Sequence, residues 1–259
     1  MHNPQASYEY LSPALPRIFA HRGFADAEGL VENTLPAFKA ALKLGATHIE
    51  SDIQVTKDGV AVLFHDDDLA RVAGLPLKIA EVDLSQLAAI DLGHGARVPT
   101  LREALTELPE ARFNLDLKVS AAITPSVELI EELGARDRVL LTSFSESRRS
   151  KAIRRCGGQV ASSAGAVRVL AIWLAAKLKF SPLVRLLARP VQALQIPTNQ
   201  GSIRFDSPGF IAAVRAAGLE IHYWTINEPE EMKRLIGLGA QGIVTDRTDL
   251  AVKTLRKPR

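Results

Sequence analysis

The amino-acid sequence predicts an α/β fold: a TIM (β/α)8 barrel, formed as one domain over residues 1–259. Short apolar runs alternate with helical patterns along most of the 259 residues. Repeated strand–helix units favour a parallel sheet, and eight of them in about 250 residues match the size of a TIM barrel. An open, doubly wound sheet would need a glycine-rich phosphate loop after its first strand, and His-Arg-Gly-Phe-Ala at residues 21–25 is not one.

Each barrel strand is expected where a short apolar run ends in polar residues. The eight predicted strands are residues 17–20, 47–53, 112–118, 138–142, 159–163, 191–196, 220–225 and 242–245. Helices are expected at residues 35–44, 101–108, 126–133, 146–155, 208–217 and 228–238, and after Asp246. The first helix has Asn33 or Thr34 as its N-cap and stops at Gly45. An accessory strand is expected at 60–64, and residues 67–98 form a mixed segment after it.

Composition argues against several classes of protein. The single cysteine, Cys156, rules out an internal disulfide, and nothing argues for an oxidising compartment. The net charge of +3 is mild and aromatic residues are only 5%, so nucleic-acid binding is not expected. The N-terminus lacks a basic stretch followed by an apolar one, and no apolar run approaches the roughly 20 residues of a membrane span. We therefore expect a cytoplasmic protein.

Polar side chains gather at the carboxyl ends of the predicted strands, where TIM barrels carry their active sites. His21 and Arg22 end the first strand, and His65 follows the accessory strand. Glu50 and Asp52 are two residues apart on the second strand, so both side chains face the same side. Further candidates at this end are Asp116 and Lys118 of the third strand, Gln195 of the sixth and Trp224 of the seventh.

The acidic candidates predict a metal site. Glu50, Asp52 and Asp116 would repel one another unless a cation or protons intervened. Oxygen ligands suit Mg²⁺, Ca²⁺ or Mn²⁺ better than zinc, so we expect one divalent cation. Taken alone, a strand-end Glu-x-Asp is more often a solvated edge or a helix cap.

The basic candidates complete the set needed for phosphoryl chemistry. Arg22 and Lys118 have the charge to bind phosphate oxygens, and His21 and His65 have the chemistry of a general acid and a general base. Single histidines are more often structural, and His48 and His222 are interpreted in that way. Complementary chemistry from independent strands at one barrel end favours the functional interpretation.

Several motifs together resemble the signature of the glycerophosphodiester phosphodiesterase family, and the resemblance covers nearly the whole chain. The motifs are His21-Arg22-Gly23, Glu32-Asn33-Thr34, Glu50-Ser51-Asp52, Thr56-Lys57-Asp58-Gly59, His65-Asp66, Val98-Pro99-Thr100-Leu101-Arg102-Glu103-Ala104-Leu105, Asn114-Leu115-Asp116-Leu117-Lys118, Ser143-Phe144, Trp224-Thr225-Ile226-Asn227 and Gly242-Ile243-Val244-Thr245-Asp246-Arg247.

The resemblance implies a TIM barrel with a small insertion, residues 66–98, after the second strand. It also implies hydrolysis of a glycerophosphodiester to glycerol 3-phosphate and an alcohol. It implies a divalent cation held by Glu50, Asp52 and the acidic residue at 116, with the two histidines as the acid–base pair and with Arg22 and Lys118 on the phosphate. The family usually has glutamate where this chain has Asp116. Aspartate is one methylene shorter, so the identity of the metal stays open.

Residues 166–190 differ from the rest of the chain in charge. They contain five basic residues and no acidic one: Arg168, Lys177, Lys179, Arg185 and Arg189. A basic amphipathic helix with an aromatic residue, here Trp173, can lie on a membrane surface, and the alternative is an ordinary barrel helix with a basic outer face.

Two alternatives to hydrolysis of water-soluble diesters remain at this point. If residues 166–190 contact a membrane, a lysophospholipase D that acts on lysophospholipids at the inner membrane surface fits the same chemistry. A catalytically silent barrel that binds phosphodiesters or membranes is a second alternative. The sequence leaves the headgroup and the oligomeric state open.

Overall fold

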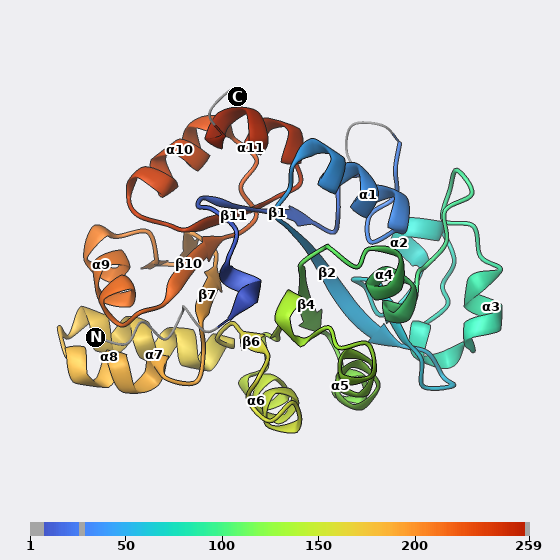
Figure 1. The fold of residues 1–259 in the computed structure, drawn as a ribbon, viewed down its shortest axis with the longest axis horizontal. Coiled ribbons are helices and arrows are strands. Elements are labelled where there is room, and N and C mark those ends of the chain that lie inside the picture. The colour runs from blue at the N-terminus through green and yellow to red at the C-terminus, as the bar shows by residue number, and fades with distance from the viewer. Residues whose placement is uncertain (1–7, 26–28, 257–259) are drawn as a thin grey trace.

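The computed structural model describes residues 8–25 and 29–256, and its centre is a ring of parallel strands (Figure 1). Neighbouring strands follow the order β6-β5-β4-β2-β1-β11-β10-β7. A single parallel bridge from Ser163 to Ala193 joins the two ends of this order and nearly closes the barrel. The strands are β1 (Arg17–His21), β2 (His48–Val55), β4 (Phe113–Leu117), β5 (Val139–Thr142), β6 (Ala161–Ser162), β7 (Ala193–Ile196), β10 (Glu220–Tyr223) and β11 (Gly242–Thr245).

Helices surround the ring and bury the outer side chains of the strands (Figure 1). Local sequence sets their ends: the Thr34 hydroxyl accepts a hydrogen bond from Ala37 N at the start of α1, and Gly45 ends that helix with φ 106°. Together with the strand order, this confirms the predicted TIM barrel. The helices are α1 (Leu35–Leu44), α4 (Leu101–Glu107), α5 (Ile123–Glu132), α6 (Glu146–Arg155), α7 (Ala166–Lys177), α8 (Ser181–Ala188), α9 (Pro208–Ala216), α10 (Pro229–Gly237) and α11 (Thr248–Leu255).

The predicted insertion follows β2 and lies beside the barrel, at the right in Figure 1. The accessory strand β3 (Ala61–Leu63), which pairs antiparallel with β2, leads into it, and it contains α2 (Ala70–Ala73) and α3 (Leu84–Ala88). Together with the β3 segment it forms a separate small core that includes Val62, Phe64, Leu69, Ile79 and Leu87. The insertion is therefore a packed unit and can hold polar side chains in place over the barrel.

The amino ends of the strands are closed by the segment before β1. Tyr10, in the 3-10 turn Glu9–Leu11, is fully buried and makes an edge contact with the His48 ring. Below it, Arg17 and Glu220 form a buried ion pair at 2.7 Å. His48 and His222 are both buried at this level of the barrel, away from the strands' carboxyl ends.

The observed elements differ from the predicted ones in several bounds, and three of these differences follow from the local sequence or backbone. α5 begins at Ile123, before the predicted residue 126, because Pro125 is tolerated in a first helical turn. β6 is only two residues long, since Gly157 and Gly158 prolong the preceding turn with positive φ. Residues 166–190 form two helices, α7 and α8, separated by a turn in which Lys179 has φ 56°. Within the described residues, no helix combines the length and the apolar character needed to cross a bilayer.

Candidate active site

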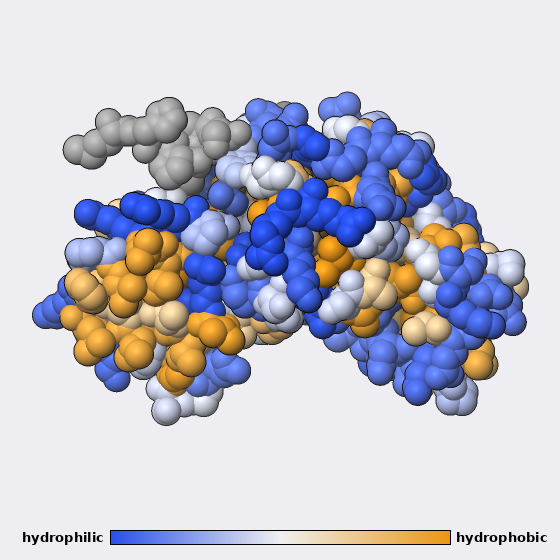
Figure 2. All heavy atoms as spheres, turned by 90° about the horizontal axis from the view of Figure 1, so that it is seen from below, coloured by the Kyte–Doolittle hydropathy of each residue, from blue (hydrophilic) through white to orange (hydrophobic). Residues whose placement is uncertain are grey.

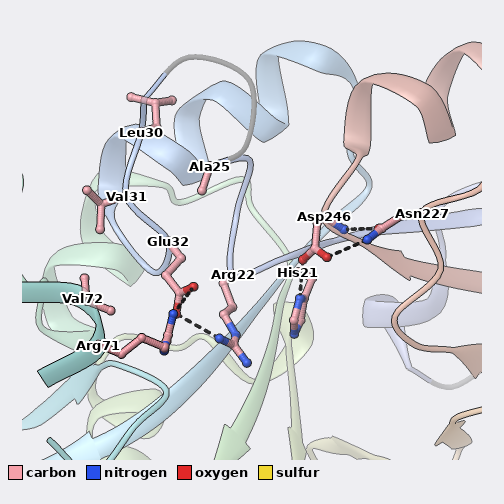
Figure 3. A pocket seen from close by; sticks show the side chains of 10 residues that line it. All are labelled: His21, Arg22, Ala25, Leu30, Val31, Glu32, Arg71, Val72, Asn227 and Asp246. Carbon is pink, nitrogen blue, oxygen red and sulfur yellow. Dashed lines mark hydrogen bonds and ion pairs between the residues drawn. The ribbon is translucent and has the colours of Figure 1, made fainter. Parts of the chain in front are cut away.

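His21, at the end of β1, is held by a carboxylate from the neighbouring strand. Its Nδ1 lies 2.6 Å from Asp246 Oδ1, and Asn227 donates a 2.8 Å hydrogen bond to the other oxygen of Asp246 (Figure 3). Burial alone would lower the pKa of His21, but the hydrogen bond to Asp246 and the charge of Glu50 give a net increase. The ring is therefore fixed through Nδ1, and Nε2 faces Glu50 Oε2 at 4.0 Å.

His65 has the same arrangement, built from the insertion. Its Nδ1 lies 2.6 Å from Asp66 Oδ1, and Arg71 donates from Nε to Asp66 Oδ2 at 2.7 Å. Arg71 also binds Glu32 at 2.5 Å, and Glu32 accepts a 2.9 Å hydrogen bond from Arg22. A continuous chain of charged side chains thus links Arg22 of the barrel to His65.

Three carboxylates lie between the two histidine groups, on β2 and β4. These strands pair with Asp52 opposite Asp116, so the two side chains leave the sheet at the same level. Lys118 Nζ lies 2.8 Å from Asp52 Oδ1 and 3.1 Å from Asp116 Oδ2. Glu50 accepts a hydrogen bond from the backbone N–H of Arg22 at 3.1 Å.

The pKa values of the three carboxyl groups are shifted in different directions. Burial, followed by the charge of Asp52, raises the pKa of Glu50 to about 7. Burial likewise raises the pKa of Asp116. Burial would raise the pKa of Asp52 too, but Lys118 holds it below its usual range. One lysine therefore offsets only part of the negative charge of the cluster.

The oxygen atoms of Glu50, Asp52 and Asp116 are of the kind that a hard divalent cation binds, but the side chains are not arranged as a complete coordination shell. In the described ranges, no group of three or more His, Cys, Asp or Glu side chains is arranged to hold a metal ion. The predicted ligands lie on adjacent strands, but Lys118 Nζ occupies the space between Asp52 and Asp116. One buried oxygen, Asp116 Oδ1, has no hydrogen-bond partner, and such an atom calls for a ligand.

The two remaining predicted residues lie at different depths. Trp224 forms part of the rim: its ring makes an edge contact with Phe144 at 5.8 Å between centroids, and Lys118 Nζ lies 6.0 Å from the Phe144 centroid. Gln195 lies lower in the barrel, with its amide nitrogen 3.4 Å from His222 Nδ1. Within the described chain, no hydrogen bond or ion pair joins Gln195 to the histidines or carboxylates of the site.

A cavity of about 690 Å³ opens beside His21, between the barrel and the insertion (Figure 3). Charged groups cover one part of its wall and apolar side chains the other. It has room for a small molecule with a charged centre and an apolar or hydroxylated arm. Its lining residues are His21, Arg22, Ala25, Leu30, Val31, Glu32, Arg71, Val72, Asn227 and Asp246.

The residues that hold the two histidines are not among the predicted site residues. For Asp246 a signal was present, because it directly follows the strand that ends at Thr245 and so lies at the active end of the barrel. Asp66 is adjacent to His65 in sequence. Glu32 belongs to one of the family motifs, but Arg71 has no such signal, and the contact between them depends on how the insertion packs against the barrel.

Comparison with known proteins identifies sequences and structures that are similar to this chain over most of its length. The model of the glycerophosphoryl diester phosphodiesterase family matches residues 21–250. A Mycobacterium tuberculosis protein named probable glycerophosphodiester phosphodiesterase 2 is 41% identical over 232 residues, which are 89% of this chain and 87% of that protein. The human protein lysophospholipase D GDPD1 is 25% identical, over 90% of this chain and 83% of its own length.

Solved structures show the same fold. The structure of an Oleispira antarctica phosphodiesterase in complex with the product sn-glycerol-3-phosphate has a TM-score of 0.76 and 24% identity, and the match covers 93% of this chain and 96% of that one. The match of the family model spans both histidines, the three carboxylates and Asp246. The chain therefore belongs to the glycerophosphoryl diester phosphodiesterase family, a family of phosphoric diester hydrolases.

Proposed function

We propose that this chain, acting as one barrel domain over residues 1–259, hydrolyses glycerophosphodiesters to glycerol 3-phosphate and an alcohol. The observation that carries the proposal is the pairing of each histidine with its own carboxylate, at 2.6 Å in both cases. A carboxylate on Nδ1 holds a proton there, so each neutral ring presents the lone pair of Nε2 to a substrate. Within the described residues, no hydrogen bond occupies either Nε2.

His21 and His65 then divide the proton transfers of hydrolysis. One takes a proton from the attacking oxygen, and the other gives a proton to the departing alkoxide. The order of the two transfers stays open. Arg22 and Lys118 bind the phosphate oxygens. The series of ion pairs from Arg22 to His65 keeps the distance between the phosphate-binding arginine and this histidine constant. Gln195 is proposed to contact the substrate lower in the barrel, and Trp224 is proposed to contact it at the rim.

Glu50, Asp52 and Asp116 are the residues that would hold one divalent cation, Mg²⁺, Ca²⁺ or Mn²⁺. When bound, such an ion draws negative charge from a phosphoryl oxygen. The proposal is supported by the burial of Glu50 and Asp116, which raises the pKa values of both with a further contribution from the charge of Asp52, and by Asp116 Oδ1, which has no hydrogen-bond partner among the described residues. Lys118 lies between two of these carboxylates and would have to move toward the phosphate.

The direct test is release of glycerol 3-phosphate from a panel of glycerophosphodiesters by the purified chain, with each of the three ions added in turn. We expect product with glycerophosphocholine or glycerophosphoethanolamine and at least one ion. Binding of the diester with no product for any headgroup or ion would instead identify a catalytically silent phosphodiester-binding barrel.

A second candidate function is lysophospholipase D activity at a membrane surface, and an apolar rim favours it. Phe144 is 61% exposed beside Trp224, so an acyl chain leaving the cavity would meet aromatic carbon. The name of the human relative points to the same chemistry in that protein. Comparing turnover of lysophosphatidylcholine with that of glycerophosphocholine separates the two functions. For this second candidate function we propose a cytoplasmic location. Residues 166–190 would make the peripheral contact with the inner membrane surface.

A further inference from the structure

The α7–α8 hairpin presents apolar side chains to solvent on its outer face. Val167, Leu170, Leu174 and Leu178 are spaced by three or four residues along α7, which places them on one side of the helix. Phe180 in the turn and Leu186 in α8 are exposed as well, and the six side chains, here called the hairpin surface, are between 48% and 73% exposed. Exposed apolar surface of this extent marks an interaction site.

Figure 2, which looks at the molecule from below the view of Figure 1, shows apolar surface gathered at the left, where α7 and α8 lie. The opposite side of α7 is already used: Val169, Ile172 and Ala175 are buried against the barrel core. The hairpin surface is therefore not needed to attach the helix. Within the described residues, nothing covers it.

Four exposed cations lie on the same hairpin as the hairpin surface. Lys177, Lys179, Arg185 and Arg189 are exposed, and among the described residues none of them pairs with a carboxylate. The fifth basic residue of the segment, Arg168, differs, because Glu146 accepts a 2.8 Å hydrogen bond from it. Exposed apolar side chains on the same hairpin as cations that pair with no carboxylate match a surface that is apolar inside and anionic at its edge.

We propose that the hairpin surface docks on an anionic phospholipid bilayer. Acyl chains would accept the leucine and phenylalanine side chains, and lipid phosphates would meet the four cations. A second copy of the chain fits this face poorly, because a symmetric contact would set the four cations of one copy against those of the other.

The anchors differ from those that the sequence suggested. Trp173, the aromatic residue of the predicted surface helix, is half-buried, and its Nε1 donates a 3.1 Å hydrogen bond to Arg204 O. Lys177 lies over its ring at 4.9 Å. Trp173 therefore fixes the hairpin to the barrel, and the leucines of α7 make the contact with lipid.

Docking would also bring lipid close to the site. Ala166 N, at the start of α7, donates a 3.0 Å hydrogen bond to Phe144 O, and Phe144 forms the rim with Trp224. The hairpin surface thus begins next to the rim of the active site. Delivery of a lysophospholipid along this path rests on the proposed function, whereas bilayer docking itself does not.

The test is flotation of the full chain with vesicles of phosphatidylcholine alone or mixed with phosphatidylglycerol, without substrate. We expect binding to the mixed vesicles at low salt and release as salt rises. In the apolar variant, Leu170→Gln, Leu174→Gln and Leu178→Gln are combined. In the charge variant, Lys179→Gln, Arg185→Gln and Arg189→Gln are combined, and its binding should weaken on the order of a hundredfold, because each basic residue contributes about fivefold.

A matched control removes the same charge elsewhere, through Lys43→Gln, Lys57→Gln and Lys253→Gln, and should bind like the wild type. All three variants change exposed residues, so unchanged melting curves and unchanged turnover of a small soluble diester should show an intact fold. Absence of wild-type binding to the anionic vesicles would overturn the proposal, as would full binding by the apolar variant. Concentration-dependent dimerisation that the apolar variant abolishes, without vesicle binding, would assign the face to a second copy instead. A catalytically inactive chain that still floats would refute only the proposed function.

Discussion

Arg71 Nη2 lies 2.5 Å from Glu32 Oε1, and through this contact the insertion is bound to the loop that carries Arg22. On its other side Arg71 binds Asp66, the carboxylate that holds His65. A residue of the insertion therefore sets the distance between Arg22, the proposed phosphate-binding arginine, and His65. This is a positioning role, since Arg71 acts through its neighbours.

The first prediction concerns Arg71→Met. Loss of both ion pairs should lower kcat/KM for a soluble diester by roughly tenfold to a hundredfold, because small displacements of reacting groups are costly. The conservative Arg71→Lys should recover part of the loss. Steady-state kinetics of both variants, beside Arg97→Gln as an insertion control that breaks only the exposed Arg97–Glu103 pair, checks this. Equal effects of Arg71→Met and Arg97→Gln would show that Arg71 merely stabilises the insertion.

The second prediction concerns the metal. Chelation should abolish hydrolysis, and Mg²⁺, Mn²⁺ or Ca²⁺ should restore it, because the charge of Glu50, Asp52 and Asp116 exceeds what Lys118 offsets. Asp116→Glu should keep activity and shift the order of preference among the ions, since its carboxylate reaches one methylene further. Calorimetric titration of the ions into both proteins gives a readout independent of turnover. Full activity after exhaustive chelation would remove the cation from the account.

The third prediction concerns the buried pair Arg17–Glu220 at the closed end of the barrel. Glu220→Gln leaves a buried guanidinium without its counter-charge, so it should cost about 3 kcal/mol of unfolding free energy near pH 7. Glu230→Gln, which breaks an exposed pair with Lys233, should cost less than about 1 kcal/mol. Denaturant unfolding of the two variants and the wild type measures both.

The same pair fixes the sign of a pH effect. Burial would raise the pKa of Glu220, but Arg17 and His222 lower it to about 2, from 4.5 in the unfolded chain. The resulting stabilisation is complete above pH 4.5 and is lost as pH falls toward 2. The wild type's advantage over Glu220→Gln should therefore shrink between pH 5 and pH 3. An advantage that grew in this range would contradict the assignment.

Features that arise from a local sequence pattern were predictable, and features that arise from side-chain geometry or from contacts between distant segments were not. The barrel and the side chains at its strand ends were predictable, because Glu50, Asp52, Asp116 and Lys118 follow the period of a strand and strand ends converge in a parallel barrel. The placement of Lys118 between two carboxylates was not, since it depends on side-chain geometry.

Contacts that join distant segments also lay beyond the sequence. Arg71 reaches Glu32 only because the insertion folds back over the barrel. The division of residues 166–190 into two helices depends on a positive φ at Lys179, a residue type with no preference for it. The inward position of Trp173 depends on a hydrogen bond from its N–H to Arg204 O, which is distant in sequence.

The central claim is that His21 and His65 transfer the protons of hydrolysis, and the most direct measurement is turnover of a diester with a poor leaving group by His21→Ala and by His65→Ala. Each variant should lose roughly 10²- to 10⁴-fold in kcat, the usual contribution of a positioned acid or base. His94→Ala is the control, because His94 is exposed on the insertion, whereas His48 is buried and its replacement would disturb the core. The account predicts folded variants with this loss and a control with normal turnover; near-normal turnover by either His21→Ala or His65→Ala would contradict it.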